Sequence, residues 1–221
     1  MIELSRDIEQ IERSLKQWFS SQAFIKAARI QDYPILPEEQ ALVANAVSSR
    51  QHEFATGRWL SRKGLQSFGL PDRPIEIGRL RNPLWPESVS GTISHDGELC
   101  AVVLMQEQQR NEAGIGIDLV SLPQRTGRMD KLAPMFMANA DELSAMAAFN
   151  LAVDPALLLF SVKESVVKAM SFQLDDFIDM RAIEVHHSDA LRFKISGNFV
   201  GADIFAATTG NYLVTAVKGH F

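Results

Sequence analysis

The stretch Gly91-Thr-Ile-Ser-His-Asp-Gly-Glu-Leu-Cys-Ala-Val-Val-Leu-Met105 decides the fold class of this 221-residue chain. Its two apolar runs flank Asp96-Gly97, a dipeptide that favours the tight turn of a β-hairpin. A third apolar run, Gly114-Ile-Gly-Ile-Asp-Leu-Val120, predicts another strand, in which both isoleucines share one face. Strands of this kind beside long helical patterns indicate an α+β fold.

Helical patterns lie on both sides of these strands. The first 30 or so residues space their apolar side chains as an amphipathic helix does, and a long helical pattern runs from about 38 to 68. Further helices are expected at 141–149 and 155–172. Strands are expected again near 181–186, 191–196, 202–208 and 212–217.

The composition, with 46% hydrophobic and 22% charged residues, is ordinary for a soluble globular protein. A net charge of -5 argues against general nucleic-acid binding. A single cysteine, Cys100, excludes a disulfide framework and favours a reducing compartment. The polar N-terminus does not resemble a signal peptide, and no apolar run approaches the ~20 residues that span a bilayer. A cytoplasmic protein without a transmembrane segment is therefore expected.

Basic residues concentrate between Arg50 and Arg81, where seven of them occur against three acidic residues. This segment carries +4, so the remainder of the chain carries -9. A basic island in an acidic protein indicates a small polyanionic ligand. A solvated helix face with scattered arginines would give the same count. Within the island, Arg58 and Arg62 lie four residues apart, on one side of the expected helix.

Asp118 interrupts the apolar strand 114–120. Gly114 and Gly116 share its face, and glycines beside a carboxylate leave space for a ligand to approach the backbone. An ionised carboxylate on a half-buried strand is costly unless it binds a cation or hydrogen-bond donors. The alternative is an aspartate at a strand end that faces solvent.

The segment Phe160-Ser-Val-Lys-Glu-Ser-Val-Val-Lys-Ala169 places Glu164 and Lys168 four residues apart, on one face of a helix. Such a carboxylate can hold a hard cation, and such an ammonium can contact a phosphate bound to it. The alternative is an ordinary surface salt bridge. The apolar neighbours predict a largely buried helix instead, in which charges need further partners. Lys163 projects about 100° away and fits a solvated position equally well.

Two more groups of residues are candidates for binding an anion. Ser94 and His95 end a strand, and both side chains can donate hydrogen bonds, although a lone histidine there is more often structural. Arg79 and Arg81 precede the rigid segment Pro83-Leu-Trp-Pro86. The chain lacks a P-loop, a Cys/His zinc pattern and a nucleophile elbow. The remaining acids and bases indicate metal-assisted phosphoryl chemistry.

Five of these segments, in this order and at these separations, resemble the 4′-phosphopantetheinyl transferases of the surfactin-synthetase type, and within them the branch that serves enterobactin-like siderophore synthetases. They are Arg50-Gln-His-Glu-Phe-Ala-Thr-Gly-Arg-Trp-Leu-Ser-Arg62, Pro83–Pro86, Gly91–Gly97, Gly114–Asp118 and Phe160–Ala169. Each motif alone is weak, and the ordered set is specific.

The resemblance implies a pseudo-dimer of two similar α/β subdomains, residues 1–112 and 113–221, with the active site in the cleft between them. The implied reaction moves phosphopantetheine from coenzyme A, the co-substrate, to a serine of an apo aryl or peptidyl carrier domain, and releases adenosine 3′,5′-bisphosphate. Nonribosomal peptide synthesis of a siderophore is the implied pathway, and a monomer is implied. The motif matches make Asp118 and Glu164 ligands of Mg2+, with Glu164 and Lys168 catalytic. They make the following residues contacts of coenzyme A: Arg50, Arg58, Arg62, Arg81 (or Arg79 in its place), Ser94, His95 and Lys168.

One position departs from the family. A second acid commonly follows two residues after the strand aspartate, and here that position is Val120. Mg2+ often binds through one or two carboxylates plus substrate phosphates, so we expect weaker metal affinity with activity retained. Two other readings stay open: a coenzyme A-binding relative with weakened catalysis, or another Mg2+-dependent phosphoryl enzyme.

Overall fold

The computed structural model describes residues 2–106, 114–125, 129–187 and 191–220. The N-terminal part contains α1 (Ile2–Trp18), β1 (Phe24–Arg29), α2 (Pro37–Val43), α3 (Ser48–Ser67), β2 (Val89–Asp96) and β3 (Leu99–Gln106). The C-terminal part contains β4 (Gly114–Ser121), α4 (Met129–Phe136), α5 (Asp141–Ala145), α6 (Pro155–Met170), β5 (Ile183–His187), β6 (Leu191–Ile195), β7 (Asn198–Val200), β8 (Ala202–Thr209) and β9 (Tyr212–Gly219).

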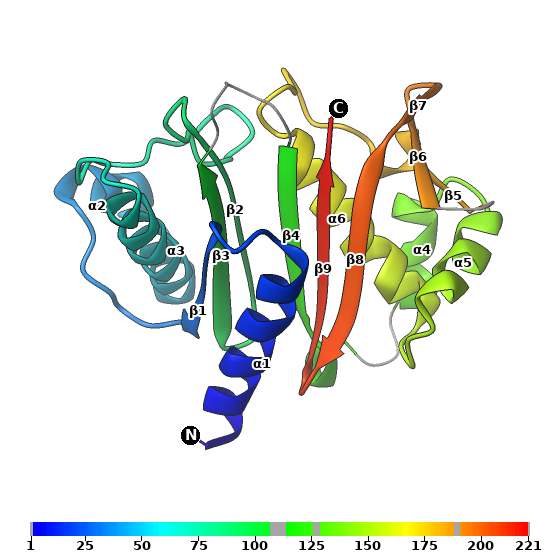
Figure 1. Ribbon diagram of the computed structural model, residues 1–221, viewed down its shortest axis with the longest axis horizontal. Coiled ribbons are helices and arrows are strands. Elements are labelled where there is room, and N and C mark those ends of the chain that lie inside the picture. Colours follow the sequence, from blue (N-terminus) through cyan, green and yellow to red (C-terminus); the bar gives the residue numbers. More distant parts are fainter. Residues whose placement is uncertain (1, 107–113, 126–128, 188–190, 221) are drawn as a thin grey trace.

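Two three-stranded antiparallel sheets form the centre of the molecule, in the orders β1-β3-β2 and β4-β9-β8 (Figure 1). In both, the first strand of the unit pairs with its third, and one helix packs against these two strands, α3 in the first unit and α6 in the second. The predicted α+β class is confirmed, and the two units share a β-α-β-β topology. The predicted boundary between 112 and 113 lies outside the described residues.

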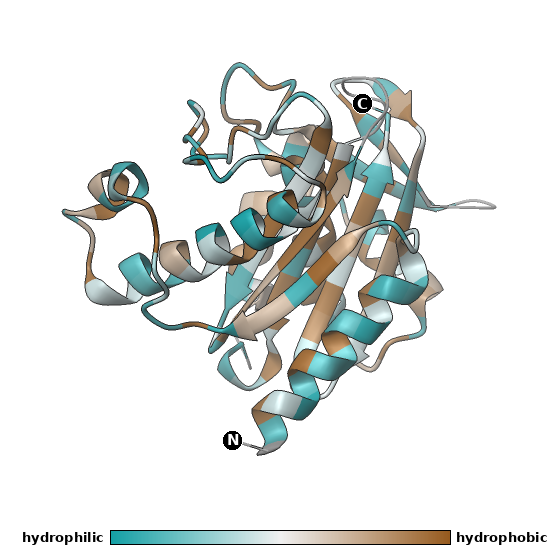
Figure 2. Ribbon diagram, turned by 60° about the vertical axis from the view of Figure 1, so that its left-hand side comes forward, coloured by the Kyte–Doolittle hydropathy of each residue, from teal (hydrophilic) through white to brown (hydrophobic). Residues whose placement is uncertain are grey.

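Helix α1 packs across both sheets, contacting β1 on one side and β8 and β9 on the other. Its buried side chains include Ile11 and Leu15, one helical turn apart. Figure 2 shows hydrophobic colour concentrated on the strands, whereas α1 alternates hydrophilic and hydrophobic residues along its length. The amphipathic pattern therefore directs α1 onto the apolar face that the two sheets share.

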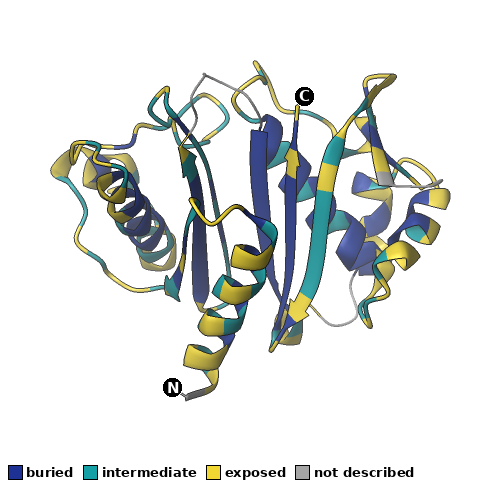
Figure 3. Cartoon of the chain, in the orientation of Figure 1, coloured by how far each residue is buried: buried dark blue, intermediate teal, exposed yellow. Residues whose placement is uncertain are grey.

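Strand β4 is buried along its whole length, as β3 and β9 largely are (Figure 3). One face carries Ile115, Ile117 and Leu119 into the cluster that also holds α1, and the opposite face lies against α6. The prediction of a half-buried strand was therefore wrong. A charged side chain on β4 has no solvent-facing side and must find its partners inside the protein.

Two other predictions about the elements need correction, and two elements were missed. The first helix ends at Trp18, and β1 follows it. The pattern from 38 to 68 forms two helices, because the Gln51 side chain donates to the carbonyl oxygens of Val43 and Ala46 where α2 ends. Helix α4 and the three-residue β7 were not predicted. Among the described residues, no helix is long and apolar enough to cross a membrane.

Candidate active site

The two sheets meet along β2 and β4. These strands are joined by hydrogen bonds from β4 backbone amides to β2 side chains. Three residues that alternate along β2 accept hydrogen bonds from three amides that alternate along β4: Thr92 from Ile117 at 3.1 Å, Ser94 from Leu119 at 3.0 Å and Asp96 from Ser121 at 2.8 Å. Both residue numbers increase together, so the two strands run parallel across this seam. The candidate site residues of both halves are brought together here.

Asp118 lies at the centre of the seam. Its Oδ1 accepts from Lys168 Nζ at 2.7 Å and from Ser94 Oγ at 3.0 Å, and its Oδ2 accepts from Ser161 Oγ at 2.9 Å. Lys168 also donates to Ser94 Oγ and to the Ile117 carbonyl oxygen, both at 3.0 Å, so all three ammonium protons have acceptors. The ammonium thus pairs with Asp118, and the alternative of a surface salt bridge between Glu164 and Lys168 is not what the structure contains.

Gly114 and Gly116 bring helix α6 against β4. A Cβ atom on Gly116 would lie 1.9 Å from the Ser165 carbonyl oxygen, and one on Gly114 would lie 2.1 Å from that of Ala169. The glycines therefore admit the helix backbone, and the prediction that they leave space for a ligand was wrong. Their absent side chains are what place Lys168 within reach of Asp118.

Glu164 lines a cavity of about 330 Å³ together with Asp118, Lys168 and the end of β2. Within the described part of the chain its carboxylate makes no hydrogen bond and no salt bridge. Burial raises the pKa of Glu164; the charge of Lys168 opposes this rise and that of Asp118 adds to it. Three carboxylates line the cavity, and one of them, Asp96, already accepts from the Ser121 amide and from Arg125, which leaves Asp118 and Glu164 for a cation.

Asp118 and Glu164 fit a hard divalent cation that takes its remaining ligands from water and a substrate, as Mg2+ commonly does. The described residues contain no group of three or more His, Cys, Asp or Glu side chains arranged to hold a metal by themselves. Val120 lies on the same cavity wall and is buried among apolar side chains. The protein thus offers two carboxylates here.

A second cavity, of about 310 Å³, adjoins the first through Ile93 and His95. It is lined by Arg50, Arg58 and Arg81, so three of the predicted arginines meet at one place. Arg81 adopts a left-handed backbone conformation, with φ of 63°. A cavity with three guanidinium groups is suited to an anion.

Arg58 is the most informative of these arginines. It is 3% exposed, stacks on the Phe54 ring, and donates one long hydrogen bond of 3.4 Å to the Glu76 carbonyl oxygen. Its buried Nε has no partner among the described residues. Burial lowers the pKa of Arg58 to about 10, which still leaves it charged at neutral pH. A buried cation with unused donors calls for an anionic ligand.

His95 connects the two cavities. Arg50 Nη1 lies 2.8 Å from His95 Nε2, and because a guanidinium cannot accept, the histidine nitrogen is the acceptor. The ring proton therefore sits on Nδ1, 3.6 Å from Glu53. Burial lowers the pKa of His95; Glu53 raises it, and Arg50 and Lys168 lower it further. Burial thus favours the neutral form of His95 in the free protein.

Arg62 is set apart from the other predicted contacts. Its Nη1 pairs with the fully buried Glu39, its Nε with Asp72 at 3.1 Å, and its Nη2 donates to the Pro34 carbonyl oxygen at 2.9 Å. It lines neither cavity described above. The guanidinium instead fastens the segment before α2 to α3.

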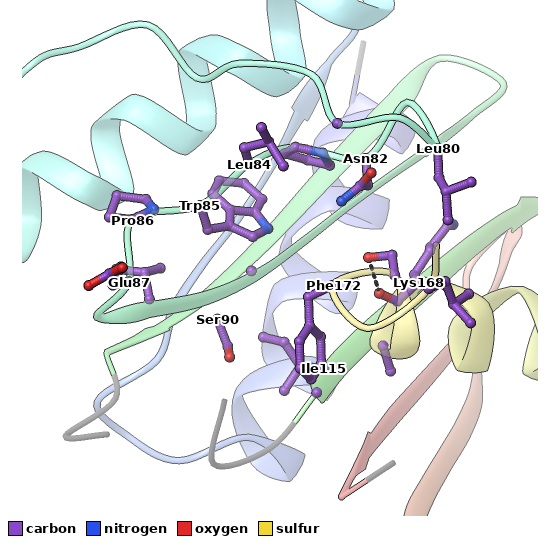
Figure 4. A pocket seen from close by; sticks show the side chains of 18 of the residues that line it. Leu80, Asn82, Leu84, Trp85, Pro86, Glu87, Ser90, Ile115, Lys168 and Phe172 are labelled. Atoms are coloured by element: carbon purple, nitrogen blue, oxygen red, sulfur yellow. Dashed lines mark hydrogen bonds between the residues drawn. The ribbon is translucent and has the colours of Figure 1, made fainter. Parts of the chain in front are cut away.

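A third cavity, of about 390 Å³, lies on the other side of Lys168 (Figure 4). The loop 78–87 supplies one wall, including Leu84 and Trp85, while Ile115 and Phe172 supply apolar groups from β4 and from the residues after α6. Arg79 lies here and Arg81 does not, so the structure separates the two arginines that the sequence left as alternatives.

Lys163 has a different position from the predicted solvated one. It is fully buried, and its ammonium binds the carbonyl oxygens of Phe136 and Met180 and the carboxylate of Glu142, which is equally buried. Burial lowers the pKa of Lys163 against the opposing effect of Glu142. Glu142 also accepts from the Val185 amide at 2.9 Å. The contacts of Lys163 and Glu142 thus hold α4, α5 and β5 against α6, the helix that carries Glu164. No local sequence pattern predicts these contacts.

Comparison with known proteins matches both halves. A family model described as 4'-phosphopantetheinyl transferase N-terminal domain matches residues 38–105, and one described as 4'-phosphopantetheinyl transferase superfamily matches residues 114–217. The 4'-phosphopantetheinyl transferase Svp of Streptomyces mobaraensis is 39% identical over 139 residues, which cover 61% of this chain and 54% of Svp. PptT of Mycobacterium tuberculosis is 30% identical over 110 residues, covering 45% of this chain and 48% of PptT.

Enterobactin synthase component D of Escherichia coli strain K12 is 34% identical over 156 residues, which cover 69% of this chain and 70% of that protein. The match thus spans about half the length of Svp and of PptT, and more of the Escherichia coli protein. These matches fall on the segments that carry the motif resemblance, and they confirm it. The chain belongs to the 4'-phosphopantetheinyl transferase superfamily.

Proposed function

We propose that this protein transfers the 4′-phosphopantetheine group of coenzyme A to a serine hydroxyl of an apo carrier protein. The observation that carries the proposal is the pair of adjoining cavities that meet at His95: one is lined by Asp118 and Glu164, and the other by three arginines. Coenzyme A joins a pyrophosphate to a separate 3′-phosphate, so its charges match two neighbouring polar sites. The family of the chain supports the same reaction.

The arginine cavity would bind phosphate oxygens of coenzyme A. Arg58 supplies unused donors from a buried position, and Arg50 and Arg81 complete the cavity. Ser94 and His95 lie where this cavity meets the carboxylate cavity, next to Lys168. Lys168 would exchange one of its present acceptors for a phosphate oxygen. Arg62 is left out of this proposal, because all its nitrogens bind protein groups.

Asp118 and Glu164 would hold Mg2+ at the pyrophosphate. The bound ion supplies charge neutralisation on the pyrophosphate oxygens. The carrier serine oxygen bonds to the β-phosphorus, the bond from that phosphorus to the bridging oxygen breaks, and adenosine 3′,5′-bisphosphate leaves. Glu164 would accept the serine proton.

Intact-protein mass spectrometry tests the proposal directly. Apo aryl- and peptidyl-carrier domains are incubated with coenzyme A and the protein, with and without Mg2+. We expect a mass gain of one phosphopantetheine that requires Mg2+ and is absent when the carrier serine is replaced by alanine. Glu164→Gln should abolish the gain while leaving the circular dichroism spectrum unchanged. A nearly wild-type rate for this variant would remove Glu164 from both of its roles.

The same panel of carriers addresses the pathway. We infer a carrier of nonribosomal peptide synthesis for a siderophore, because a relative with 34% identity is an enterobactin synthase component. Faster transfer to aryl- and peptidyl-carrier domains than to a fatty-acid carrier would support this inference.

Val120 favours one other function, a coenzyme A-binding protein with weakened catalysis. Calorimetric binding of coenzyme A without transfer to any carrier of the panel would support this second function.

A further inference from the structure

Three buried hydroxyl groups form a continuous chain that ends on Asp118. Ser161 and Ser165 lie one helical turn apart on α6, and Thr215 lies opposite Asp118 in the register of β4 with β9. The Oγ–Oγ distances are 2.8 Å from Ser165 to Thr215 and 2.9 Å from Thr215 to Ser161, and Ser161 Oγ lies 2.9 Å from Asp118 Oδ2. All three hydroxyl residues have no exposed surface.

The positions of the hydroxyl protons follow from these contacts. The Asp118 carboxylate, which is ion-paired with Lys168, can only accept, so the single Ser161 proton points to it. The single Thr215 proton is donated to the Ser161 carbonyl oxygen at 3.0 Å and is shared with the Ser161 hydroxyl oxygen at 2.9 Å. Ser165 is in turn the donor toward Thr215. All three O–H dipoles therefore point the same way, toward the carboxylate.

The three hydroxyl groups complete the set of hydrogen bonds that hold the Asp118 carboxylate. Each Asp118 oxygen can accept about two hydrogen bonds. Oδ1 uses both on Lys168 and Ser94, whereas Oδ2 accepts from Ser161 and from no other group in the described part of the chain. Bonds on both oxygens prevent rotation of the carboxylate, and they leave one acceptor direction open on Oδ2.

We propose that Ser161, Thr215 and Ser165 are positioning residues that orient Asp118 so that the free acceptor direction of Oδ2 is available to a divalent cation. The inference rests on the proposed function, in which Asp118 holds that cation. Side chains that orient metal-binding carboxylates typically change metal affinity by 10- to 100-fold when removed. The three hydroxyls would thus tune metal binding from the side of β4 that α6 covers.

The test compares two substitutions of Thr215. Thr215→Val keeps the side-chain volume and removes the hydroxyl, whereas Thr215→Ser keeps the hydroxyl and loses a methyl group. Binding of Mn2+ is measured by electron paramagnetic resonance on the full chain in the presence of coenzyme A. Ser161→Ala serves as a second variant should Thr215→Val fold poorly. The matched control is Ser61→Ala, a buried helical serine whose hydroxyl donates to the Gly57 carbonyl oxygen.

We expect Thr215→Val and Ser161→Ala to bind Mn2+ about tenfold more weakly, with Thr215→Ser and Ser61→Ala close to wild type. Transfer should show the same order in kcat, with KM for coenzyme A changed less than twofold. Packing alone would instead make Thr215→Ser the weaker variant. Equal Mn2+ affinity in Thr215→Val and wild type would overturn this inference alone. Wild-type protein that binds no Mn2+ would overturn the metal role of Asp118, and this inference with it.

Discussion

Val120 lies on the cavity wall that Asp118 and Glu164 also line, and it is buried. We predict that Val120→Glu lowers the melting temperature without ligands, because a carboxylate then enters an apolar wall without a partner. In the presence of coenzyme A and Mg2+ the loss should be recovered, and the Mg2+ concentration for half-maximal transfer should fall. Thermal unfolding and a Mg2+ titration measure both effects. Val120→Gln is the control, with a smaller destabilisation because its side chain is uncharged, and with no gain in Mg2+ affinity. An unchanged Mg2+ requirement in Val120→Glu would refute the prediction.

His95 predicts a pH dependence of coenzyme A binding. Burial holds the pKa of His95 below its usual value of about 6.5, and a bound phosphate would raise it. Between these two pKa values the complex carries a proton that the free protein lacks, so affinity should increase as pH falls toward 6.5. The stability of the free protein should change with pH in the opposite direction. Below about pH 6.5 the unfolded chain takes up the His95 proton more readily than the folded protein, so the free energy of unfolding decreases as pH falls.

Calorimetric titrations of coenzyme A at pH 7 in buffers of different ionisation enthalpy measure this proton uptake. His95→Gln should eliminate the buffer dependence. His52→Gln, which changes a histidine of α3 that lines neither cavity, should keep it. Identical heats in all buffers for the wild-type protein would exclude proton uptake by His95.

At the scale of single residues, the sequence was informative where a charged residue interrupted an apolar pattern. Asp118 and Glu164 could be singled out in this way, and the structure places both at one cavity. Thr215 could not, since a threonine in a strand is unremarkable until the pairing with β4 places it opposite Asp118. Arg62 looked like Arg58 in sequence, and its partners Glu39, Asp72 and Pro34 separate the two in the structure.

Helix α6 depends on its close approach to β4 for the geometry of the site. We predict that Gly116→Ala lowers the free energy of unfolding by about 1–3 kcal/mol, because the new methyl group must displace the backbone at Ser165. The displacement moves Glu164 and Lys168 away from Asp118, so transfer should decrease more than stability alone explains. Chemical denaturation and mass spectrometry measure the two effects.

Gly201→Ala provides the control for this variant. A Cβ atom at Gly201 would meet nothing within 4 Å, so the substitution should change neither stability nor transfer. Wild-type transfer by a folded Gly116→Ala protein would mean that α6 tolerates the shift and that its close approach does not set the site.

The elements were predictable where one physical signal dominated. The hairpin predicted from Asp96-Gly97 is present, but its turn residues are Gly97, with a φ of 59°, and Glu98, because Asp96 still pairs with Leu99. The break between α2 and α3 was hidden, because the Gln51 side chain satisfies the carbonyl oxygens there, that of Val43 at the end of α2 and that of Ala46 after it. Helix α4 carries Pro134 inside it, which works against a helix prediction.

The whole molecule is two similar units that meet at the site along β2 and β4, where β2 side chains accept from β4 amides and Ser94 also binds Asp118 and Lys168. The arginine cavity belongs to the first unit and the carboxylates to the second. A ligand that contacts both cavities therefore joins the units, and its affinity depends on their relative position. Ser94 takes part in both the seam and the site, because its hydroxyl accepts from the Leu119 amide between the units and donates to Asp118 in the site.

We predict that Thr92→Val loosens this seam, because it leaves the buried amide of Ile117 without an acceptor, at a cost of about 1–3 kcal/mol. Thr56→Val is the matched control: Thr56 is equally buried and accepts from the Gln31 amide at the same 3.1 Å, but both residues lie within the first unit. Both variants should lose stability in thermal unfolding, and only Thr92→Val should also bind coenzyme A more weakly in calorimetry. Equal coenzyme A affinity in the two variants would mean that the site does not depend on how the units are joined.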